Sequence, residues 1–536
     1  MPAPTTPTTA VTTPVLIVGG GPVGLTLSVL LSAHGVDHLL VEARPDTSRH
    51  PKARGISARS MEVLRRCGLE EPVRRAGLPA SQVHFYRGRS LVDPHYVRTG
   101  LAPGAPDGEE ATPSPGLICS QDVLEPILRR RAERAGPGRI RFGTRLLSFA
   151  RGADDQGVRA VLRNVVTGEE SLVHAGWLVG CDGVASTVRA GAGIALSGPT
   201  GLGHYLSIRF EAPLGPVVAD RASASYFLTE PGRGGFMAVD NDRRWIYQYP
   251  VTADALGADD TDLTDPLYLA ELVRTAAGIP DLAVTVQDTL GWRMDARLAD
   301  RYRSSRVLLA GDAAHVVPPT GGHGMNTGIG DADNLAWKLA AVVAGQAGSA
   351  LLDSYEAERR PLARQVIELS TANAGARAGY RIDDELLLTA RYRSCAVVPD
   401  DDLPAPRPPL DPAGHRPGAG PGDRAPHVWL DGAGAVTSTL DLLGPGFTLV
   451  VQGEAPSWRR QAAAAAAAGL PVTVRPLTTA RQHEREPGRW LRLCGVPADG
   501  AVLVRPDGHL AWRAPRPPAD EGTLLAVLRR VLGGDV

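Results

Sequence analysis

The stretch "VLIVGGGPVGLTLSVLLSAHGVDHLLVE", Val15–Glu42, decides the fold of this chain. A continuous apolar run suited to a buried strand leads into three glycines, and an apolar helix follows to about His34. A second apolar run then ends at Glu42. A strand, a helix and a second strand in this order form the βαβ unit on which many α/β proteins bind nucleotides. We therefore expect an α/β fold that begins with a single dinucleotide-binding unit.

The glycines after the first strand have the spacing of a dinucleotide-binding turn, with Pro22 inside the motif. Gly19 permits the tight turn, Gly21 lets a pyrophosphate approach the helix N-terminus, and Gly24 lets helix and strand pack closely. Glu42 stands at the end of the second strand, where an acid accepts hydrogen bonds from an adenosine ribose. Glycine-rich stretches near residues 201 and 418 lack the flanking strand and helix. Separate folds for a flavin and a nicotinamide are therefore disfavoured.

Length, charge and cysteine content narrow the function classes. The 536 residues suffice for two or three domains and for burying a large cofactor. Lys and Arg total 57 against 58 Asp and Glu, and no basic run is long enough to follow a phosphate backbone, so nucleic acid is not an expected partner. The five cysteines contain no C-x-x-C pair, which argues against a disulfide framework, a metal site and a redox dithiol.

The first residues bear on localisation. Residues 1–13 contain neither Lys nor Arg and no apolar core, so we interpret them as a disordered lead-in and not as a signal peptide. The apolar run from Val15 to Val36 is interrupted by glycines and Pro22, which fits the βαβ unit better than a membrane span. We expect a cytoplasmic protein that does not bind membranes.

Hydrophobic patterning divides the rest of the chain, up to the C-terminal part, into a region of strands and several helices. Residues 203–294 alternate polar with apolar or aromatic side chains, which predicts one antiparallel sheet. Helices are predicted at Ser120–Gly136, capped by Ser120, at about Thr327–Ala344 and at about Leu351–Ala376. We therefore expect a discontinuous dinucleotide-binding domain that comprises residues 14–75, 110–195 and 295–380. The substrate domain is expected to comprise residues 76–109 and 196–294.

A change of composition marks the last part of the chain. Residues 400–426 are rich in Pro and Gly and predict a linker. Residues 427–536 outline a small α/β domain with an alanine-rich helix and a hairpin turn at Asp507-Gly508. We expect this C-terminal domain to have a core of its own.

Three motifs carry a resemblance to a known family. Gly19-x-Gly21-x-x-Gly24, Cys181-Asp182-Gly183 with Ser186 and Arg189, and Gly311-Asp312 through Asn326 resemble, in this order, the fingerprints of the single-component FAD-dependent aromatic hydroxylases, or class A flavoprotein monooxygenases. The resemblance covers residues 15–375. "HPKARGISARSMEVLRRCG" and, in the tail, "PGDRAPHVWL" and "VLVRPDGHLAWR" are similar to the branch that acts on aromatic polyketides and other large polycyclic phenols.

The resemblance implies how FAD is held. Asp312 would accept a hydrogen bond from the ribityl or ribose chain, and Pro318–Gly322 would lie beside the isoalloxazine, where glycines leave the reactive face open. The helix that starts near Met325 would direct its unpaired N–H groups at the flavin edge where negative charge collects on reduction. The residues implied in cofactor binding are Gly19, Gly21, Pro22, Gly24, Glu42, Arg44, Lys52, Gln121, Asp182, Asp312, Pro318, Gly322, Gly324, Met325 and Asn326.

Ordinary structural roles stay open for several of these side chains. Asp312 and Asp182 are also suited to closing their own turns, and Gln121 is also an ordinary residue of a first helical turn. Arg44 and Lys52 either reach a pyrophosphate as charges or remain solvated surface cations.

The substrate is expected between the flavin and the middle sheet. Flat aromatic ligands prefer apolar, aromatic pockets with few polar anchors, and aromatic residues, only 5% of the chain, cluster from 226 to 249. Each candidate is alternatively a core residue. The expected substrate wall consists of Tyr226, Phe227, Phe236, Met237, Tyr247, Trp292 and Met294, together with Pro318.

The implied activity is that of a monooxygenase with FAD as cofactor and NADPH or NADH and O₂ as cosubstrates. A C4a-hydroperoxyflavin would hydroxylate a large, polyketide-type phenol or quinone. Two alternatives stay open: Baeyer–Villiger oxidation or epoxidation on the same fold, and a flavin-binding resistance protein that modifies or sequesters an aromatic antibiotic. No catalytic residue is assigned, and His315 is interpreted as a packed loop histidine.

The C-terminal domain resembles a thioredoxin fold. Its single cysteine, Cys494, argues against thiol exchange. We therefore expect a structural or dimer-forming role for this domain, in a protein that is a monomer or a homodimer.

Overall fold

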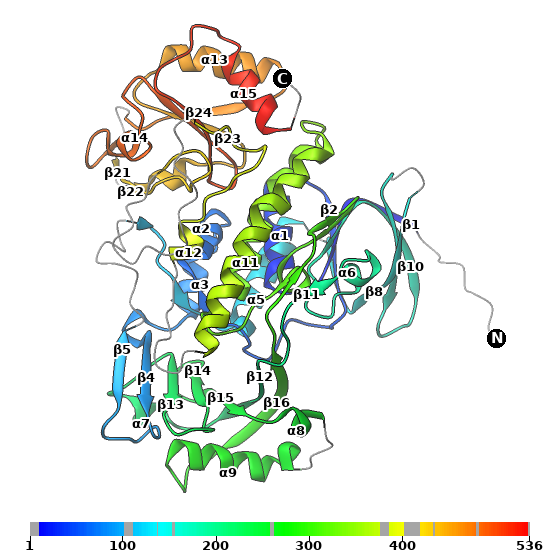
Figure 1. The fold of residues 1–536 in the computed structure, drawn as a ribbon, viewed down its shortest axis with the longest axis vertical. Helices are drawn as coiled ribbons and strands as arrows, with labels where there is room; N and C mark the ends of the chain where they lie inside the picture. The colour runs from blue at the N-terminus through cyan, green and yellow to red at the C-terminus, as the bar shows by residue number, and fades with distance from the viewer. Residues whose placement is uncertain are drawn as a thin grey trace, which may run out of the picture.

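The chain folds into three units stacked along its longest axis (Figure 1). In this view the C-terminal unit lies at the top, the N-terminal unit in the middle and a second large sheet at the bottom. Residues 1–9 of the predicted lead-in lie outside the described residues. Residues 10–13 belong to the first strand, so the prediction of a disordered segment is wrong for these four residues. The computed structural model describes residues 10–100, 111–136, 138–152, 156–257, 262–375, 385–400, 419–432, 435–478 and 482–533.

The N-terminal unit is built on an eight-stranded sheet with a parallel centre. β1 (Ala10–Val18) pairs in parallel with β2 (His38–Glu42) on one side and with β10 (Glu170–Gly180) on the other. Parallel neighbours require crossover connections that cover the sheet, and α1 (Pro22–Ala33) is the first of them. The βαβ prediction is therefore confirmed. The remaining strands are β7 (Ile140–Phe142), β8 (Thr144–Arg151), β9 (Val158–Asn164), β18 (Arg303–Ser304) and β19 (Val307–Leu309).

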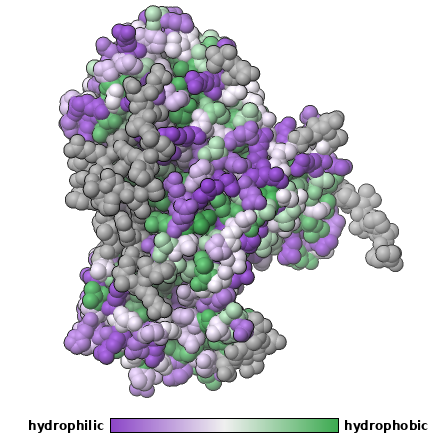
Figure 2. Space-filling model, in the orientation of Figure 1, coloured by the Kyte–Doolittle hydropathy of each residue, from purple (hydrophilic) through white to green (hydrophobic). Residues whose placement is uncertain are grey.

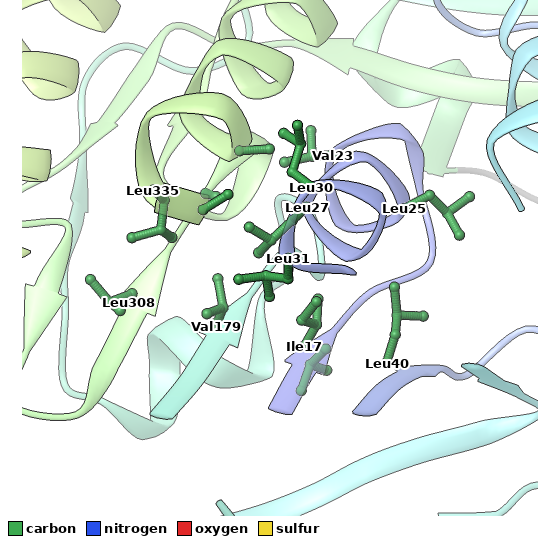
Figure 3. Close-up of a cluster of buried hydrophobic side chains, with 14 of the residues drawn as sticks. Ile17, Val23, Leu25, Leu27, Leu30, Leu31, Leu40, Val179, Leu308 and Leu335 are labelled. Carbon is green, nitrogen blue, oxygen red and sulfur yellow. The ribbon is translucent and has the colours of Figure 1, made fainter. Parts of the chain in front are cut away.

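Helix α1 lies inside the core of this unit. In Figure 3, Leu27 and Leu31 of α1 lie beside Ile17 and Val179 of the sheet, and all four side chains are at most 1% exposed. Each fully buried aliphatic side chain contributes about 1.5–3 kcal/mol, so this packing fixes the glycine turn that precedes the helix. The surrounding helices are α2 (Ala58–Arg66), α3 (Glu70–Ala76), α5 (Gln121–Ala135), α6 (Thr187–Gly191), α10 (Gly324–Val343) and α11 (Asp353–Gly375).

Helix α11 covers the outside of the N-terminal unit. Its inner side chains Tyr355, Ala363 and Val366 are fully buried, while hydrophilic side chains cover much of its outer surface (Figure 2). None of the described helices is long and apolar enough to cross a bilayer. Short elements complete this unit: β3 (Gly55–Ile56), β6 (Leu117–Ile118), β11 (Leu196–Ser197), β17 (Arg297–Ala299), β20 (His315–Val316), η1 (Ala80–Gln82), η4 (Gly311–Ala313), η5 (Ser349–Leu352) and α12 (Glu385–Leu388).

The middle sheet has seven strands in the order β16-β12-β15-β14-β13-β4-β5. The pairs among the strands of residues 203–294 are all antiparallel, so the prediction of one antiparallel sheet is confirmed there. The earlier strand β4 adds to this sheet in parallel with β13. The helix α9 (Pro266–Ala277) covers its outer face, at the bottom of Figure 1. The other elements are β4 (His84–Gly88), β5 (Val97–Gly100), β12 (Gly203–Glu211), α7 (Gly215–Val218), β13 (Ser225–Leu228), β14 (Gly235–Ala238), β15 (Arg244–Pro250), α8 (Ala253–Gly257), η3 (Asp262–Thr264) and β16 (Thr285–Met294).

The C-terminal unit is an α/β unit on a four-stranded sheet of order β24-β23-β26-β27. The hairpin predicted at Asp507-Gly508 is confirmed, since it joins the antiparallel strands β26 and β27. A second sheet of order β22-β21-β25 lies beside it. The elements are β21 (Trp429–Gly432), β22 (Ala435–Ser438), η6 (Thr439–Leu442), β23 (Phe447–Val451), α13 (Pro456–Ala467), β24 (Val472–Pro476), β25 (Gln482–Glu484), α14 (Arg489–Leu493), β26 (Ala501–Val504), β27 (Leu510–Ala514) and α15 (Thr523–Val531).

The C-terminal unit has a buried core of its own, as expected, and it shares a second buried cluster with the N-terminal unit. Trp337 of α10 and Leu351 belong to the same buried cluster as Leu449 and Leu503 of the C-terminal sheet. Residues 401–418 of the predicted linker lie outside the described residues, whereas residues 419–426 are buried. Within that part Arg424 forms a buried ion pair with Glu62 of α2. Pro/Gly composition alone does not distinguish a flexible linker from a packed irregular segment.

Candidate active site

A cavity of about 2670 Å³ lies where the three units meet. Its walls come from the glycine turn after β1, the loop before α10, the inner face of the middle sheet and the C-terminal unit. Sites for one small ligand usually measure roughly 300–1000 Å³. The cavity therefore has room for a large cofactor and a second ligand.

The glycine motif forms the first wall of this cavity. Gly19 has φ +114°, and a Cβ at this position would lie 2.2 Å from the Cys181 carbonyl oxygen. Over Gly21 the space is open, since the nearest atom to a Cβ would be 4.0 Å away. Gly24 lies behind the wall, where a Cβ would stand 2.0 Å from the Gly19 oxygen. Gly19, Gly21 and Pro22 border the cavity, and Gly24 serves helix packing.

Glu42 borders the cavity in a fixed orientation. The side chain accepts hydrogen bonds from the Gly20 amide (2.7 Å) and from the Arg44 amide (2.9 Å), and Arg44 Nε lies 3.1 Å from it. The carboxylate is therefore held at the end of β2, where the motif requires an acceptor for a ribose hydroxyl. Arg44 borders the cavity, but its charge is already paired with Glu42.

Gln121 and Lys52 also border the cavity. Gln121 Oε1 accepts from the Ala53 amide (3.3 Å) and its Nε2 donates to Glu125 (2.6 Å), so its carboxamide holds the loop that contains Lys52. Ser120 occupies the predicted N-cap position of α5, but its hydroxyl makes no capping hydrogen bond.

Asp182 uses both carboxylate oxygens in its own turn. Oδ1 accepts from Ser186 Oγ (2.5 Å) and Oδ2 from the Val188 amide (3.1 Å), which closes the turn into α6. Burial raises the pKa of this carboxyl. Asp182 also borders the cavity, so closing its own turn does not prevent it from facing a ligand there.

Asp312 presents its carboxylate to the cavity. Burial raises its pKa, although His315 and Lys52 oppose this effect. Asp331 of α10 fixes the loop behind it by accepting hydrogen bonds from the Gly311 amide (3.1 Å) and from His315 Nε2 (2.7 Å). His315 is fully buried. The interpretation of this residue as a packed loop histidine is confirmed.

The N-terminus of α10 faces the same part of the cavity. Gly322, Gly324, Met325 and Asn326 border it. The Asn326 side chain accepts from the Ser57 amide (2.9 Å) and donates to the oxygens of Gly55 (3.0 Å) and Gly322 (2.7 Å). The carboxamide thus clamps the loop, and the unpaired first-turn N–H groups of the helix give this wall a positive potential.

Pro318 corrects one expectation about this loop. It is buried and does not border the cavity, whereas its neighbours Val317 and Pro319 do. Pro318 is therefore withdrawn from both the cofactor wall and the substrate wall, because its ring is buried inside the loop.

The middle sheet supplies the aromatic wall, but only with alternate residues. Phe227, Met237, Trp292 and Met294 border the cavity as expected. Three other candidates point to the opposite face, because successive side chains of a strand alternate between faces. The buried core under α9 contains these wrongly expected wall residues, Tyr226, Phe236 and Tyr247.

The same alternation places unexpected residues on the wall. Tyr205 stacks on Trp292 with 4.7 Å between ring centroids. Gln248 accepts from Trp292 Nε1 (3.1 Å) and donates to Ser207 Oγ (2.6 Å), which forms a short polar strip among the rings. Counting in twos from Trp292 along its own strand finds Leu290 and Met294, but the other members lie on neighbouring strands and follow only from the strand register, in which Tyr205 is opposite Trp292. The further members of the wall are Phe85, Ile246 and Leu290.

The arrangement fits FAD and a flat ligand. The open cradle over Gly21, the oriented acceptor Glu42 and the amide end of α10 match a pyrophosphate, a ribose and an anionic ring edge, respectively. The described His, Cys, Asp and Glu residues form no cluster suited to a metal ion.

Comparison with known families agrees with this geometry. Residues 12–370 match the FAD binding domain family, and residues 419–534 match the aromatic-ring hydroxylase C-terminal family. The chain is 40% identical to the tetracenomycin B2 monooxygenase-dioxygenase of Streptomyces olivaceus, over 97% of this chain and 98% of that protein. It is 39% identical to the aklavinone 12-hydroxylase RdmE of Streptomyces purpurascens, with the same coverage.

Solved structures show the same relationship. The flavin-dependent monooxygenase PieE, in complex with FAD and substrate, superposes with a TM-score of 0.90 at 32% identity, covering 99% of this chain and 100% of that chain. Aklavinone-11 hydroxylase, in a ternary complex with FAD and aklavinone, gives 0.84 at 38% identity, covering 97% and 99%. With the glycine cradle and the aromatic wall on one cavity, these matches show that the chain is an FAD-dependent monooxygenase and belongs to the aromatic-ring hydroxylases, in the branch of the polyketide hydroxylases.

Proposed function

We propose that this enzyme hydroxylates a large phenol or quinone of the aromatic polyketide type, with NAD(P)H and O₂ as cosubstrates. The observation that carries the proposal is the continuity of the cavity, which joins the FAD cradle to the aromatic face of the middle sheet. Two relatives are named for the hydroxylation of aklavinone, and the solved structure of one of them contains aklavinone beside FAD.

The residues of the first wall hold the cofactor. The Gly21 cradle and the start of α1 take the pyrophosphate, Glu42 accepts from the ribose, and Asp312 accepts from the ribityl hydroxyls. Bound FAD supplies the oxygen-transfer chemistry, after reduction by NAD(P)H and reaction with O₂. The N–H groups at the start of α10 stabilise negative charge on the pyrimidine edge of the ring.

The residues of the middle sheet hold the substrate. Phe227, Met237 and Trp292 form an apolar surface for a flat ring system, and desolvation of that surface drives binding. The Gln248 and Ser207 strip satisfies a hydroxyl or carbonyl group, which fixes the rotation of the ring system in its plane. The orientation of the substrate then selects the carbon that is oxidised.

The sheet order of the C-terminal unit supports a thioredoxin-like fold. β23 and β24 are parallel with α13 between them, and the antiparallel pair β26–β27 precedes α15. Cys494 is fully buried, and burial holds the pKa of its thiol well above the usual range. A structural role of this unit is therefore proposed, without thiol exchange.

The test is substrate-stimulated turnover of the FAD-loaded enzyme. We expect hydroxylated polycyclic quinones to accelerate NADPH oxidation, and mass spectrometry to find one atom from ¹⁸O₂ in the product. Trp292→Ala should lower this stimulation while FAD content stays unchanged, because Trp292 belongs to the substrate wall. A protein that takes up no FAD, or one whose products carry no label from ¹⁸O₂ with any accepted phenol, would contradict the proposal.

A further inference from the structure

Tyr205 stands on the cavity face of the middle sheet. It belongs to β12, lies opposite Trp292 in the strand register and borders the cavity. Its neighbour Leu206 belongs to the core under α9, as the alternation of side chains along a strand requires. The rings of Tyr205 and Trp292 are stacked, with 4.7 Å between centroids and 17° between planes. A flat ligand that covers Trp292 therefore lies beside Tyr205 as well.

A glycine determines where the Tyr205 hydroxyl lies. Gly203 is two residues earlier in the same strand, so a side chain at this position would also stand on the cavity face. A Cβ at Gly203 would lie 2.9 Å from Tyr205 Cε2 and 3.3 Å from the hydroxyl oxygen. The phenol ring thus lies over the Gly203 backbone, next to Met294, which is opposite Gly203 and borders the cavity. The glycine leaves room for the hydroxyl at this end of the aromatic wall.

The Tyr205 hydroxyl has unused hydrogen-bonding capacity. The neighbouring Gln248 carboxamide is bonded to Trp292 Nε1 and to Ser207 Oγ within the protein. None of the residues that the structure describes forms a hydrogen bond with the Tyr205 hydroxyl, and its half-buried side chain leaves this oxygen accessible to water. A large flat ligand on the wall displaces that water. Such a ligand must then supply an oxygen atom or leave the hydroxyl unpaired, which is unfavourable.

We propose that Tyr205 is a specificity-determining residue whose hydroxyl donates a hydrogen bond to a carbonyl or phenolate oxygen of the polycyclic substrate. The inference rests on the proposed function, because it places the substrate on the aromatic wall. An apolar wall holds many flat ring systems, whereas a wall with a polar group of its own rejects ligands that leave this group unpaired. The wall therefore selects an oxygenated ring system over a bare aromatic hydrocarbon and holds one of its oxygens at the Met294 end.

Binding of two matched probes to the full-length, FAD-loaded protein tests this inference. 1,8-Dihydroxyanthraquinone carries acceptor oxygens, and anthracene has the same three rings without them. Tyr205→Phe removes the hydroxyl alone and keeps the ring that stacks on Trp292. We expect it to weaken binding of the quinone roughly 2- to 13-fold, as for the loss of one hydrogen bond. Binding of anthracene should not weaken, because anthracene has no hydrogen bond to lose.

Tyr249→Phe is the matched control, because Tyr249 is a half-buried tyrosine of the same sheet that packs against the core under α9 and does not border the cavity. It should change the affinity for neither probe, and both variants should retain FAD. Equal weakening of both probes by Tyr205→Phe would show that the residue only supports the packing of the wall and would overturn the inference. Unchanged quinone binding in Tyr205→Phe, or a wild-type protein that binds the quinone no better than anthracene, would also overturn it. The binding test uses neither NADPH nor O₂, so each of these outcomes leaves the ¹⁸O₂ test of the proposed function unaffected.

Discussion

Replacing Arg505 by Met should destabilise the whole enzyme, including the FAD-binding unit. The Arg505 guanidinium is fully buried between two carboxylates of different units. Its Nη1 and Nη2 lie 2.6 and 2.9 Å from the Glu358 oxygens of α11, and its Nε lies 3.1 Å from Asp507 of the C-terminal hairpin. Lys338 remains as a cation beside Glu358 at 2.8 Å. The substitution thus leaves two buried carboxylates, with Lys338 beside Glu358 and the His509 ring 3.5 Å from Asp507.

The expected magnitude follows from this geometry. Breaking a buried ion pair by removing one partner costs about 3–5 kcal/mol, which is roughly a 10²- to 10³-fold or larger change in the folding equilibrium. Arg460 provides the matched control, since it forms an ion pair with Glu521 at 2.9 Å in which both side chains are at least 60% exposed. Exposed pairs contribute about 0–1 kcal/mol. Arg460→Met should therefore leave stability almost unchanged.

Urea unfolding of the FAD-loaded proteins tests whether the C-terminal unit unfolds together with the FAD-binding unit or independently of it. Tryptophan fluorescence follows unfolding, and the fluorescence of released FAD follows loss of the cofactor site. If the C-terminal unit is integral, Arg505→Met lowers the midpoints of both signals together, with the slope of the transition unchanged. If FAD release kept its wild-type midpoint while only the tryptophan signal shifted, the units would unfold independently and the reasoning would be refuted. Equal effects of Arg505→Met and Arg460→Met would refute it as well.

Three further predictions concern the cofactor site and acid stability. Asp312→Ala should weaken FAD binding roughly 5- to 150-fold, because a lost buried hydrogen-bond partner costs about 1–3 kcal/mol; equilibrium dialysis of FAD measures it, and unchanged affinity would assign Asp312 to its turn alone. Gly24→Ala should abolish FAD binding, since its Cβ would stand 2.0 Å from the Gly19 oxygen, whereas Gly446→Ala, with no atom within 4 Å, should bind FAD normally. Burial alone would raise the pKa of Glu62, but Arg424 and Arg59 outweigh it and lower this pKa to about 2. The stability that Glu62 contributes is present above its ordinary pKa of 4.5 and is lost as the pH falls towards 2. The free energy of unfolding should therefore depend less on pH in this range for Glu62→Gln than for the wild type. An unchanged pH dependence would contradict the role of Glu62 as a buried, ionised partner of Arg424.

The sequence predicted the cofactor side of the cavity better than the substrate side, for a physical reason. A turn that approaches a phosphate needs glycine at fixed spacings, so Gly19, Gly21 and the acid at Glu42 are recognisable from local sequence. The substrate wall depends on which face of each strand is turned inward, and both faces of this sheet carry aromatic residues. Tyr226 and Phe227 are neighbours in the chain, yet one lies in the core under α9 and the other on the cavity. Composition identified the sheet, and only its packing against α9 distinguishes its faces.

The sequence predicted the position of the C-terminal unit even less well, because the unit is held by buried ion pairs and hydrogen bonds between residues far apart in the chain. Asp507 stands in a hairpin turn, where an acid is ordinarily solvated. Here it accepts hydrogen bonds from Trp337 Nε1 (3.2 Å) and Asn334 Nδ2 (3.3 Å) of α10. The first turn of that same helix faces the flavin site. Anchoring the body of α10 fixes the direction of its N-terminal amides, so the hairpin helps to orient the groups that we propose to stabilise charge on the flavin.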